Sequence, residues 1–264
     1  MKQVVCINWG TAYGARYINR LYAMVARNIT PPFRFIAFTD TTDGVRPEVE
    51  CFDLPEMPGF MPRNTPGKWP KSRLWAPKLG DLTGNFLFLD LDVLVTDSLD
   101  PFFEYGDPDG LVMGLNVAKL PRRMGQSSVY RMPVGKLAAL YEMFAADPQG
   151  IAEKYRYEQF FVAANAPGGV QFWPRKWMRH FRIECIPLLP LNFFRPPRLR
   201  TGCRVVIFAG GPNPPEAITG QQRPDEPPMS PMHFIRDRLA AGKGLRELQN
   251  YGLPAPWVGD YWRE

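Results

Sequence analysis

The chain has 264 residues, of which 45% are hydrophobic and 22% charged, with a formal net charge of +6. This composition is that of a normal globular protein, long enough for one large domain or two small ones. No stretch approaches the ~18 consecutive apolar residues of a membrane-spanning helix. The first residues lack the pattern of a signal peptide, and the four scattered cysteines argue against disulfides and structural zinc. We therefore expect a protein of the reducing cytoplasm.

The first elements form a strand–helix–strand pattern. Residues 4–8 predict a strand, and a Gly-punctuated loop follows it. Residues 15–28 predict a helix, because apolar side chains recur there at helical spacing. Residues 34–39 predict a second strand, so the unit is expected to be parallel with a right-handed crossover. Residues 55–70 are rich in proline and glycine and predict a long surface loop.

The remaining elements complete an α/β pattern with a less regular C-terminal third. Helices are expected at residues 72–81, kinked by Pro77, and at residues 134–146, 151–165 and 234–241. Strands are expected at residues 111–115 and 205–208. An aromatic tail, residues 257–262, ends the chain.

The most informative segment is the apolar run Phe86–Val95, which contains Asp90 and Asp92. The run predicts a buried strand, and the two carboxylates cannot face a dry core because an unpaired buried charge costs several kcal/mol or more. We therefore expect them at the rim of a sheet, where open α/β folds bind ligands. Two acidic oxygens there suit a hard divalent cation, which can clamp a diphosphate.

The segments Lys71–Leu79 and Leu87–Phe102 resemble the donor-binding core of family 8-like retaining glycosyltransferases, which include bacterial lipooligosaccharide galactosyltransferases and glycogenin. Three features carry the resemblance: an Arg-Leu pair at Arg73, apolar residues before the acids, and a Ser-Leu-x-Pro-aromatic exit at Ser98–Phe102. The resemblance implies a GT-A-type, Rossmann-like domain with a mixed central sheet over residues 1–215. Residues 216–264 would be a Pro-rich and aromatic extension packed on it.

The resemblance also implies the donor site. Asp90 and Asp92 would hold Mn²⁺, or Mg²⁺, that bridges the diphosphate of a nucleotide sugar, most simply a UDP-sugar. Such an ion stabilises the charge that grows on the departing diphosphate. Arg73 would touch the donor sugar or phosphate, and Lys71, with Lys68 nearby, would assist it.

Two further groups of residues match the family's functional positions. Glu158 and Gln159 correspond to an acidic residue followed by glutamine near the reactive carbon of the sugar, where they would stabilise an oxocarbenium-like centre. Four residues stand where the family holds the base and ribose: Asn8, Thr11, Tyr13 and Asp40. The absence of a G-x-G-x-x-G run argues against a dinucleotide cofactor.

The C-terminal loop, residues 208–214, matches the family in its glycines and prolines, and Gly210, Gly211 and Asn213 are the expected donor contacts. It departs from the family at two points. Phe208 or Ala209 stands where a metal-binding histidine is expected, and Asn213 stands where a lysine grips the diphosphate. The metal would then have only two protein ligands, unless His233 substitutes, and binding of metal alone should be weak.

Positive charge is concentrated in the basic segment, residues 172–206, where a single acid, Glu184, opposes eight basic residues interleaved with aromatic ones: Arg175, Lys176, Arg179, Arg182, Arg195, Arg198, Arg200 and Arg204. The segment is either a solvated face or a surface that binds anions. No nucleic-acid-binding motif accompanies it, so nucleic acid is not an expected partner. We expect peripheral contact with the anionic inner face of a membrane that carries the acceptor.

The predicted function is retaining transfer of a hexose from a nucleotide sugar to a glycan or glycolipid, as in polysaccharide biosynthesis. One alternative is a catalytically impaired sugar-nucleotide-binding or scaffold protein on the same fold. Another is a haloacid-dehalogenase-like phosphatase, whose motif also contains two aspartates. That motif continues with Gly-Thr, whereas Val93 and Leu94 follow Asp92 here, and it normally lies on the first strand.

Overall fold

The computed structural model describes residues 1–222, 224 and 226–264. The chain forms two compact units: unit 1 comprises Met1–Leu91 and Ser98–Arg175, and unit 2 comprises Asp92–Asp97 and Lys176–Glu264. This division differs from the predicted boundary after residue 215. The reason is that β9 (Met178–His180) and β10 (Val205–Ile207) pair with each other, and β10 pairs with β5 (Leu94–Val95), in a sheet of their own.

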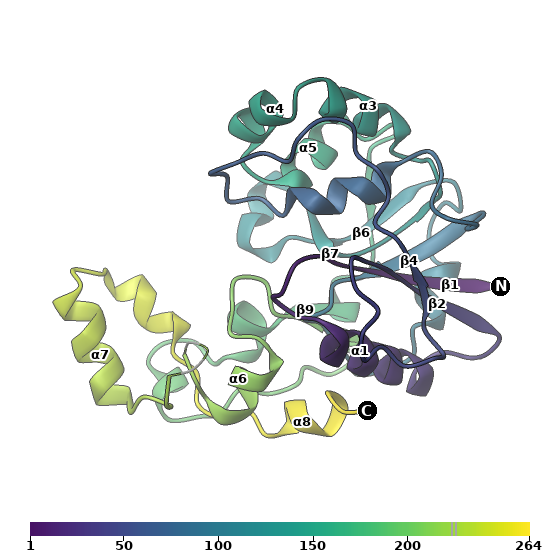
Figure 1. The fold of residues 1–264 in the computed structure, drawn as a ribbon. Helices are drawn as coiled ribbons and strands as arrows, with labels where there is room; N and C mark the ends of the chain where they lie inside the picture. Colours follow the sequence, from purple (N-terminus) through teal and green to yellow (C-terminus); the bar gives the residue numbers. More distant parts are fainter. Residues whose placement is uncertain (223, 225) are drawn as a thin grey trace. The chain divides into compact units, whose positions relative to one another are not determined.

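Unit 1 contains the main sheet of the molecule (Figure 1). Its strands are β1 (Lys2–Asn8), β2 (Phe33–Thr39), β3 (Glu50–Phe52), β4 (Asn85–Leu89), β6 (Leu111–Leu115), β7 (Gly125–Pro133) and β8 (Val170–Phe172). Its helices are α1 (Ala15–Arg27), α2 (Asp100–Glu104), α3 (Ala138–Ala146), α4 (Pro148–Tyr155) and α5 (Glu158–Asn165), with the 3-10 helices η1 (Trp69–Trp75) and η2 (Val117–Arg122).

The sheet is mixed, as predicted, with the strand order β3-β2-β1-β4-β7-β6-β8. Strands β2, β1 and β4 are parallel, with Asn8 opposite Thr39 and Val5 opposite Phe88. Strand β7 runs antiparallel to β4 and pairs Val129 with Leu89. The carboxyl ends of β1, β2 and β4 and the start of β7 therefore meet at one edge of the sheet, where open α/β folds place ligands.

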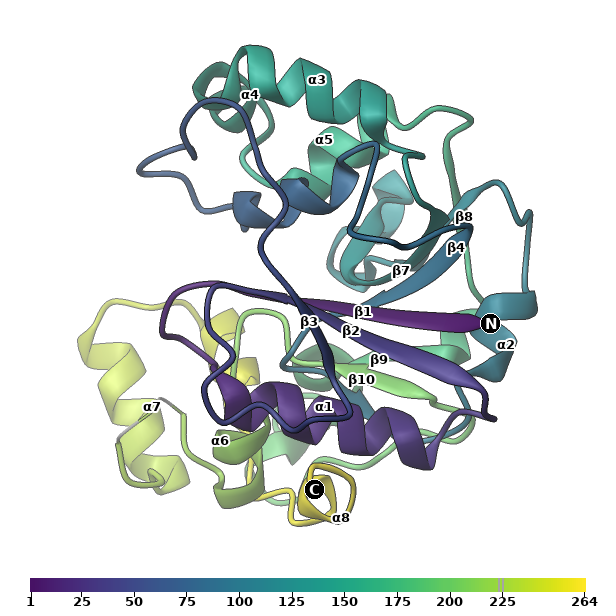
Figure 2. The same cartoon turned by 45° about the vertical axis from the view of Figure 1, so that its right-hand side comes forward.

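Helices cover both faces of this sheet (Figures 1 and 2). Helix α1 lies on one face, where Tyr22 contacts Phe35 edge-on at 5.5 Å between ring centroids. Helices α3, α4, α5 and η1 lie on the other face. Side chains of a strand alternate between the two faces of the sheet. Val5 and Phe38 belong to the hydrophobic core between the sheet and these helices, together with aromatic rings of the helices.

The 3-10 helix η1 is fixed by aromatic packing. The ring of Trp69 stacks on Phe144 of α3 at 5.0 Å with an interplanar angle of 7°, and Trp75 contacts Phe144 edge-on. Both tryptophans are almost fully buried. Because Lys71 lies between them, this packing sets where its backbone stands.

Three predicted helices differ from the observed ones. The helix expected at residues 72–81 is η1, which ends before Pro77 because a residue preceding proline favours extended backbone, here Ala76 with ψ 147°. The helix expected at 134–146 begins only at Ala138. The helix expected at 151–165 is two helices, α4 and α5, separated at Arg156, whose φ is 63°.

Unit 2 consists of the three-stranded sheet β5-β10-β9 with short helices around it. These are α6 (Pro214–Thr219), α7 (Pro231–Ala240) and α8 (Trp257–Tyr261), together with the π-helical turn η4 (Phe181–Cys185) and the 3-10 turns η3 (Arg175–Trp177), η5 (Leu191–Phe193) and η6 (Leu245–Asn250). A small separate core joins Phe193, Phe234, Leu248 and Tyr251. Within the described ranges, every helix falls short of the length and hydrophobicity needed to cross a bilayer.

Candidate active site

Asp90 stands directly after β4, at the ligand-binding edge predicted from the sequence. Its backbone N–H donates to the carbonyl of Ser128 on β7, at 2.9 Å. Its carboxylate pairs with the ammonium of Lys71, whose Nζ lies 2.5 Å from Oδ1 and 2.7 Å from Oδ2. Lys71 is 7% exposed. The first aspartate is therefore held by a buried lysine from η1.

Glu158 begins helix α5 and is also buried. Its carboxylate accepts hydrogen bonds from the hydroxyl of Ser127, at 3.0 Å, and from the backbone N–H of Lys68, at 2.9 Å. The side-chain oxygen of Gln159 accepts from the backbone N–H of Ser127, at 3.3 Å. Ser127 on β7 thus holds both predicted catalytic residues.

Neighbouring residues of β7 contact both Asp90 and Glu158. Ser128 fixes the backbone of Asp90, and Ser127 fixes the side chain of Glu158. Strand β7 was not predicted, because the polar residues Gln126, Ser127, Ser128 and Arg131 interrupt its apolar pattern. Buried polar groups require partners, so this polar run is the sequence feature that could have indicated a hydrogen-bonded strand at this position.

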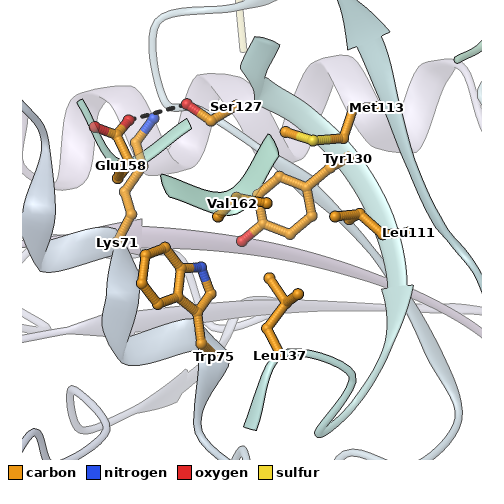
Figure 3. Close-up of a pocket in the computed structure, with 9 residues that line it drawn as sticks. All are labelled: Lys71, Trp75, Leu111, Met113, Ser127, Tyr130, Leu137, Glu158 and Val162. Atoms are coloured by element: carbon orange, nitrogen blue, oxygen red, sulfur yellow. Dashed lines mark hydrogen bonds between the residues drawn. The ribbon is translucent and has the colours of Figure 1, made fainter. Parts of the chain in front are cut away.

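A pocket opens beside these residues in unit 1 (Figure 3). The polar side chains Lys71, Ser127 and Glu158 lie together on one side of it, and the rest of the lining is mostly apolar: Trp75, Leu111, Met113, Tyr130, Leu137 and Val162. The Tyr130 hydroxyl points into the pocket and finds no hydrogen-bond partner among the described residues. Burial raises the pKa of Tyr130, and the carboxylates of Asp90 and Glu158 raise it further.

The predicted base-binding residues lie around the loop between β1 and α1, in unit 1. Asn8 is buried, with Nδ2 donating to the hydroxyl of Thr39 at 3.1 Å and Oδ1 accepting from the N–H of Gly14 at 3.3 Å. The Asp40 carboxylate accepts from the N–H of Gly10, at 2.7 Å. Asn8 and Asp40 therefore shape the loop. Gly10 and Gly14 have φ values of 63° and 66°, which other residues rarely adopt.

The side chains of Thr11 and Tyr13 are more exposed to solvent than that of Asn8. Thr11 is exposed and Tyr13 is half-buried, with its ring 4.7 Å from that of Tyr17. An exposed polar residue beside a partly exposed ring is an arrangement that can bind a nucleobase. Contact of these two residues with a base stays a prediction.

Arg73 has a structural partner: its Nη1 donates to the carbonyl of Pro55, at 2.5 Å. This bond anchors the long loop that the proline and glycine content predicted. In unit 1 it is Lys71, on the same 3-10 helix, that reaches Asp90. The contact of Arg73 with a donor stays a prediction.

The other predicted site residues belong to unit 2. Asp92 is half-buried and precedes β5 in the sequence. Gly210 and Gly211 have φ values of 78° and 75° in the loop before α6, and the N–H of Asn213 donates to the carboxylate of Glu216, at 2.8 Å. Their predicted contacts with a donor, and that of Asp92 with a metal, stay predictions.

The residues described here do not fit the predicted resident metal ion. Both carboxylate oxygens of Asp90 face an ammonium, and in the described ranges no group of three or more His, Cys, Asp or Glu side chains could hold a metal. Phe208, at the family's histidine position, is buried and stacks on Phe181 at 4.8 Å. His233 is exposed on α7. Neither Phe208 nor His233 therefore supplies the third ligand that the family's metal site uses.

The fold is that of GT-A-type glycosyltransferases. The galactosyltransferase LgtC, solved in complex with donor and acceptor sugar analogues, superposes with a TM-score of 0.56 and 16% identity over 97% of this chain and 99% of LgtC. GlyE of Streptococcus pneumoniae has a TM-score of 0.55 and 12% identity over 97% of this chain and 66% of its own.

The bifunctional glycosyltransferase WbbM is similar over part of its length. Its TM-score is 0.56 at 12% identity, covering 81% of this chain and 46% of WbbM, so this chain spans less than half of that protein. No family model matches the sequence, and no curated protein matches it. The similarity is therefore one of structure, and it confirms the predicted fold.

Proposed function

We propose that this protein is a glycosyltransferase that moves a hexose from a nucleotide sugar, a UDP-sugar in the first instance, to a hydroxyl of a glycan or glycolipid. One observation carries the proposal. Strand β7 links Asp90 and Glu158 at the edge where β1, β2 and β4 end, on a fold shared with glycosyltransferases. An open α/β sheet binds its ligands at this edge.

The site residues suit the charges of glycosyl transfer. Positive charge grows on the anomeric carbon as its bond to phosphate breaks. The Glu158 carboxylate and the Gln159 side chain can stabilise that charge, and they are fixed in advance by Ser127. The Asp90 carboxylate can accept hydrogen bonds from sugar hydroxyls. We further propose that the configuration at the anomeric carbon is retained, as the resemblance implies.

The test is nucleotide release from a panel of UDP- and GDP-hexoses, with wild-type protein and the variant Glu158→Gln. The wild type should release nucleotide and the variant should not. Glu153→Gln is the matched control, since Glu153 is exposed on α4 and its carboxylate accepts a hydrogen bond from the neighbouring Gln149, at 2.8 Å. Donor binding without release would support the scaffold alternative, and phosphate release from a small phosphoester would support the phosphatase.

Retention is tested separately, by NMR of the product. A UDP-hexose with an α-linked sugar should give an α-linked product. A β-linked product would contradict the retaining mechanism and leave the transferase proposal intact.

We also propose that the basic segment contacts an anionic membrane face. Within unit 2, Leu188 and Phe194 are 73% and 76% exposed, and Arg195 and Arg198 are exposed beside them in the sequence. Exposed apolar side chains next to basic ones are typical of surfaces that bind anionic lipids. Arg179 and Arg182 have internal partners, because Arg179 pairs with Glu184 at 2.7 Å and Arg182 donates to the Gly210 carbonyl at 3.2 Å.

The membrane proposal is tested by sedimentation with vesicles that contain phosphatidylglycerol. The triple variant Phe194→Ser, Arg195→Glu, Arg198→Glu should sediment less than the wild type. The control Arg63→Glu/Lys78→Glu makes the same charge change of −4 on two exposed residues of unit 1, and it should sediment like the wild type. Equal sedimentation of the wild type and the triple variant would refute membrane contact by this segment.

A further inference from the structure

The ion pair between Lys71 and Asp90 replaces a contact that the resemblance assigns to a metal ion. We propose that the ammonium of Lys71 is the resident cation of the Asp90 carboxylate, so that the free protein binds no divalent ion there and sugar transfer needs none. The claim about transfer rests on the proposed function. The claim about metal binding does not.

The geometry of the pair leaves little of the carboxylate for a metal. Nζ of Lys71 lies within 2.7 Å of both oxygens, so the ammonium occupies the direction from which a bidentate ion would approach. A hard divalent ion binds carboxylate oxygen at about 2.0–2.1 Å, which would bring two positive centres close together. The side chains of Lys71 and Asp90 are 9% and 16% exposed, so water screens this repulsion poorly.

The lysine is held in this position from several sides. Its helix is fixed by the stack of Trp69 on Phe144. Its ammonium lies 5.6 Å from the ring centroid of Phe88, on β4, the strand directly before Asp90. The pair is therefore part of a packed layer, and Lys71 does not need to be ordered by a ligand.

The sequence departures in the C-terminal loop agree with this inference. If no metal ion binds at Asp90, a histidine in the C-terminal loop is not required as a ligand. Phe208 stands at that position and packs against Phe181 within unit 2. The Phe208 side chain has no atom that can ligate a metal. The position at which the family has a metal-binding histidine therefore supplies no metal ligand here.

The reaction balances without a metal ion. The bond between the anomeric carbon and the β-phosphate oxygen breaks, and its electron pair stays on that oxygen. The acceptor hydroxyl oxygen forms the new bond to the anomeric carbon, and its proton passes to the departing phosphate oxygen. Lys71 takes no part in this proton transfer and contributes positive charge close to Asp90, beside which we expect the donor.

A titration of the protein with Mn²⁺ in the absence of a nucleotide sugar, monitored by electron paramagnetic resonance, tests the inference. The wild type and Asp90→Asn should bind Mn²⁺ equally weakly, because Asp90 is already occupied. Lys71→Met should bind Mn²⁺ at least about tenfold more tightly, since its Asp90 is unpaired, and Lys71→Met/Asp90→Asn should lose that gain. Wild-type binding that Asp90→Asn abolishes would overturn the inference, and this comparison remains decisive if Lys71→Met does not fold.

Nucleotide release from the UDP-hexose panel, with a chelator or with added Mn²⁺, tests the claim about transfer. The rate in chelator should equal the rate with Mn²⁺. Release that requires Mn²⁺ would overturn the inference while supporting the proposed function. No release under either condition would instead count against the proposed function, and the Mn²⁺ titration would still decide the role of Lys71.

Discussion

Replacing Ser127 by alanine tests whether β7 positions the carboxylate of Glu158, for which we propose a role at the reacting carbon. The change removes the hydroxyl that donates to Glu158 at 3.0 Å and leaves the backbone N–H that holds Gln159. Both Ser127 and Glu158 are more than nine-tenths buried, so water does not readily replace the lost donor. The variant should fold normally, because one hydroxyl is removed from a nine-residue strand.

The expected magnitude follows from the hydrogen bond. A bond to a charged group contributes about 1.5–3 kcal/mol, and one lost by a buried group is costly. If that energy holds Glu158 in its reactive position, kcat should fall roughly 10- to 150-fold, since about 1.4 kcal/mol corresponds to tenfold. KM for the donor should change less, because the substitution alters a group that acts at the reacting carbon.

The assay is steady-state release of UDP from the best donor of the panel. Ser128→Ala is the matched control: Ser128 is an equally buried serine on the same strand, and its hydroxyl accepts from Gln126 at 3.3 Å without contacting Glu158. Equal kinetics of Ser127→Ala and Ser128→Ala would refute the positioning role. Restoration of kcat in Ser127→Thr, which keeps a hydroxyl, would support it.

Three predictions concern stability, measured by urea unfolding. His180 is buried, and this burial, reinforced by Arg182 and opposed by Glu184, lowers its pKa from 6.5 to about 4. As the pH falls through this range, the unfolded chain takes up a proton before the folded chain does, so the free energy of unfolding should drop by up to about 3 kcal/mol. The variant His180→Gln should not show this drop. Burial works to raise the pKa of Asp100, but hydrogen bonds from Lys2 and Thr30 outweigh it and lower the pKa. Asp100→Asn should therefore lower the free energy of unfolding by about 1–2 kcal/mol at neutral pH, and by progressively less as the pH falls through the lowered pKa. A loss of stability that stays constant with pH would contradict this. Trp69→Ala should cost about 3–5 kcal/mol because it leaves Phe144 unstacked, whereas a loss below about 1 kcal/mol would show that η1 is held by other contacts.

Three strands of the main sheet were predictable from the sequence. Residues 4–8, 34–39 and 111–115 follow apolar patterns that the structure confirms in β1, β2 and β6. The position of Asp90 at the end of β4 was predictable for a physical reason, since a charge at that point of an apolar run must leave the core. The GT-A-type fold followed from the residues around that run.

The partners of the site residues were not predictable. Lys71 and Arg73 are two residues apart on η1, and only the three-dimensional packing decides that Lys71 reaches Asp90 while Arg73 reaches Pro55. Ser127 was missed because a buried strand with several polar residues has no apolar alternation. The division into two units was missed because β5, only two residues long, pairs with distant β10 and not with its neighbours in sequence.

The central claim is that sugar transfer takes place in unit 1, between the end of β4 and the start of α5. A crystal structure of the protein with bound UDP-hexose measures this most directly. We predict the hexose beside Asp90, Glu158 and Gln159, and the uracil beside Thr11 and Tyr13. A nucleotide sugar bound away from Asp90 and Glu158 would contradict the account.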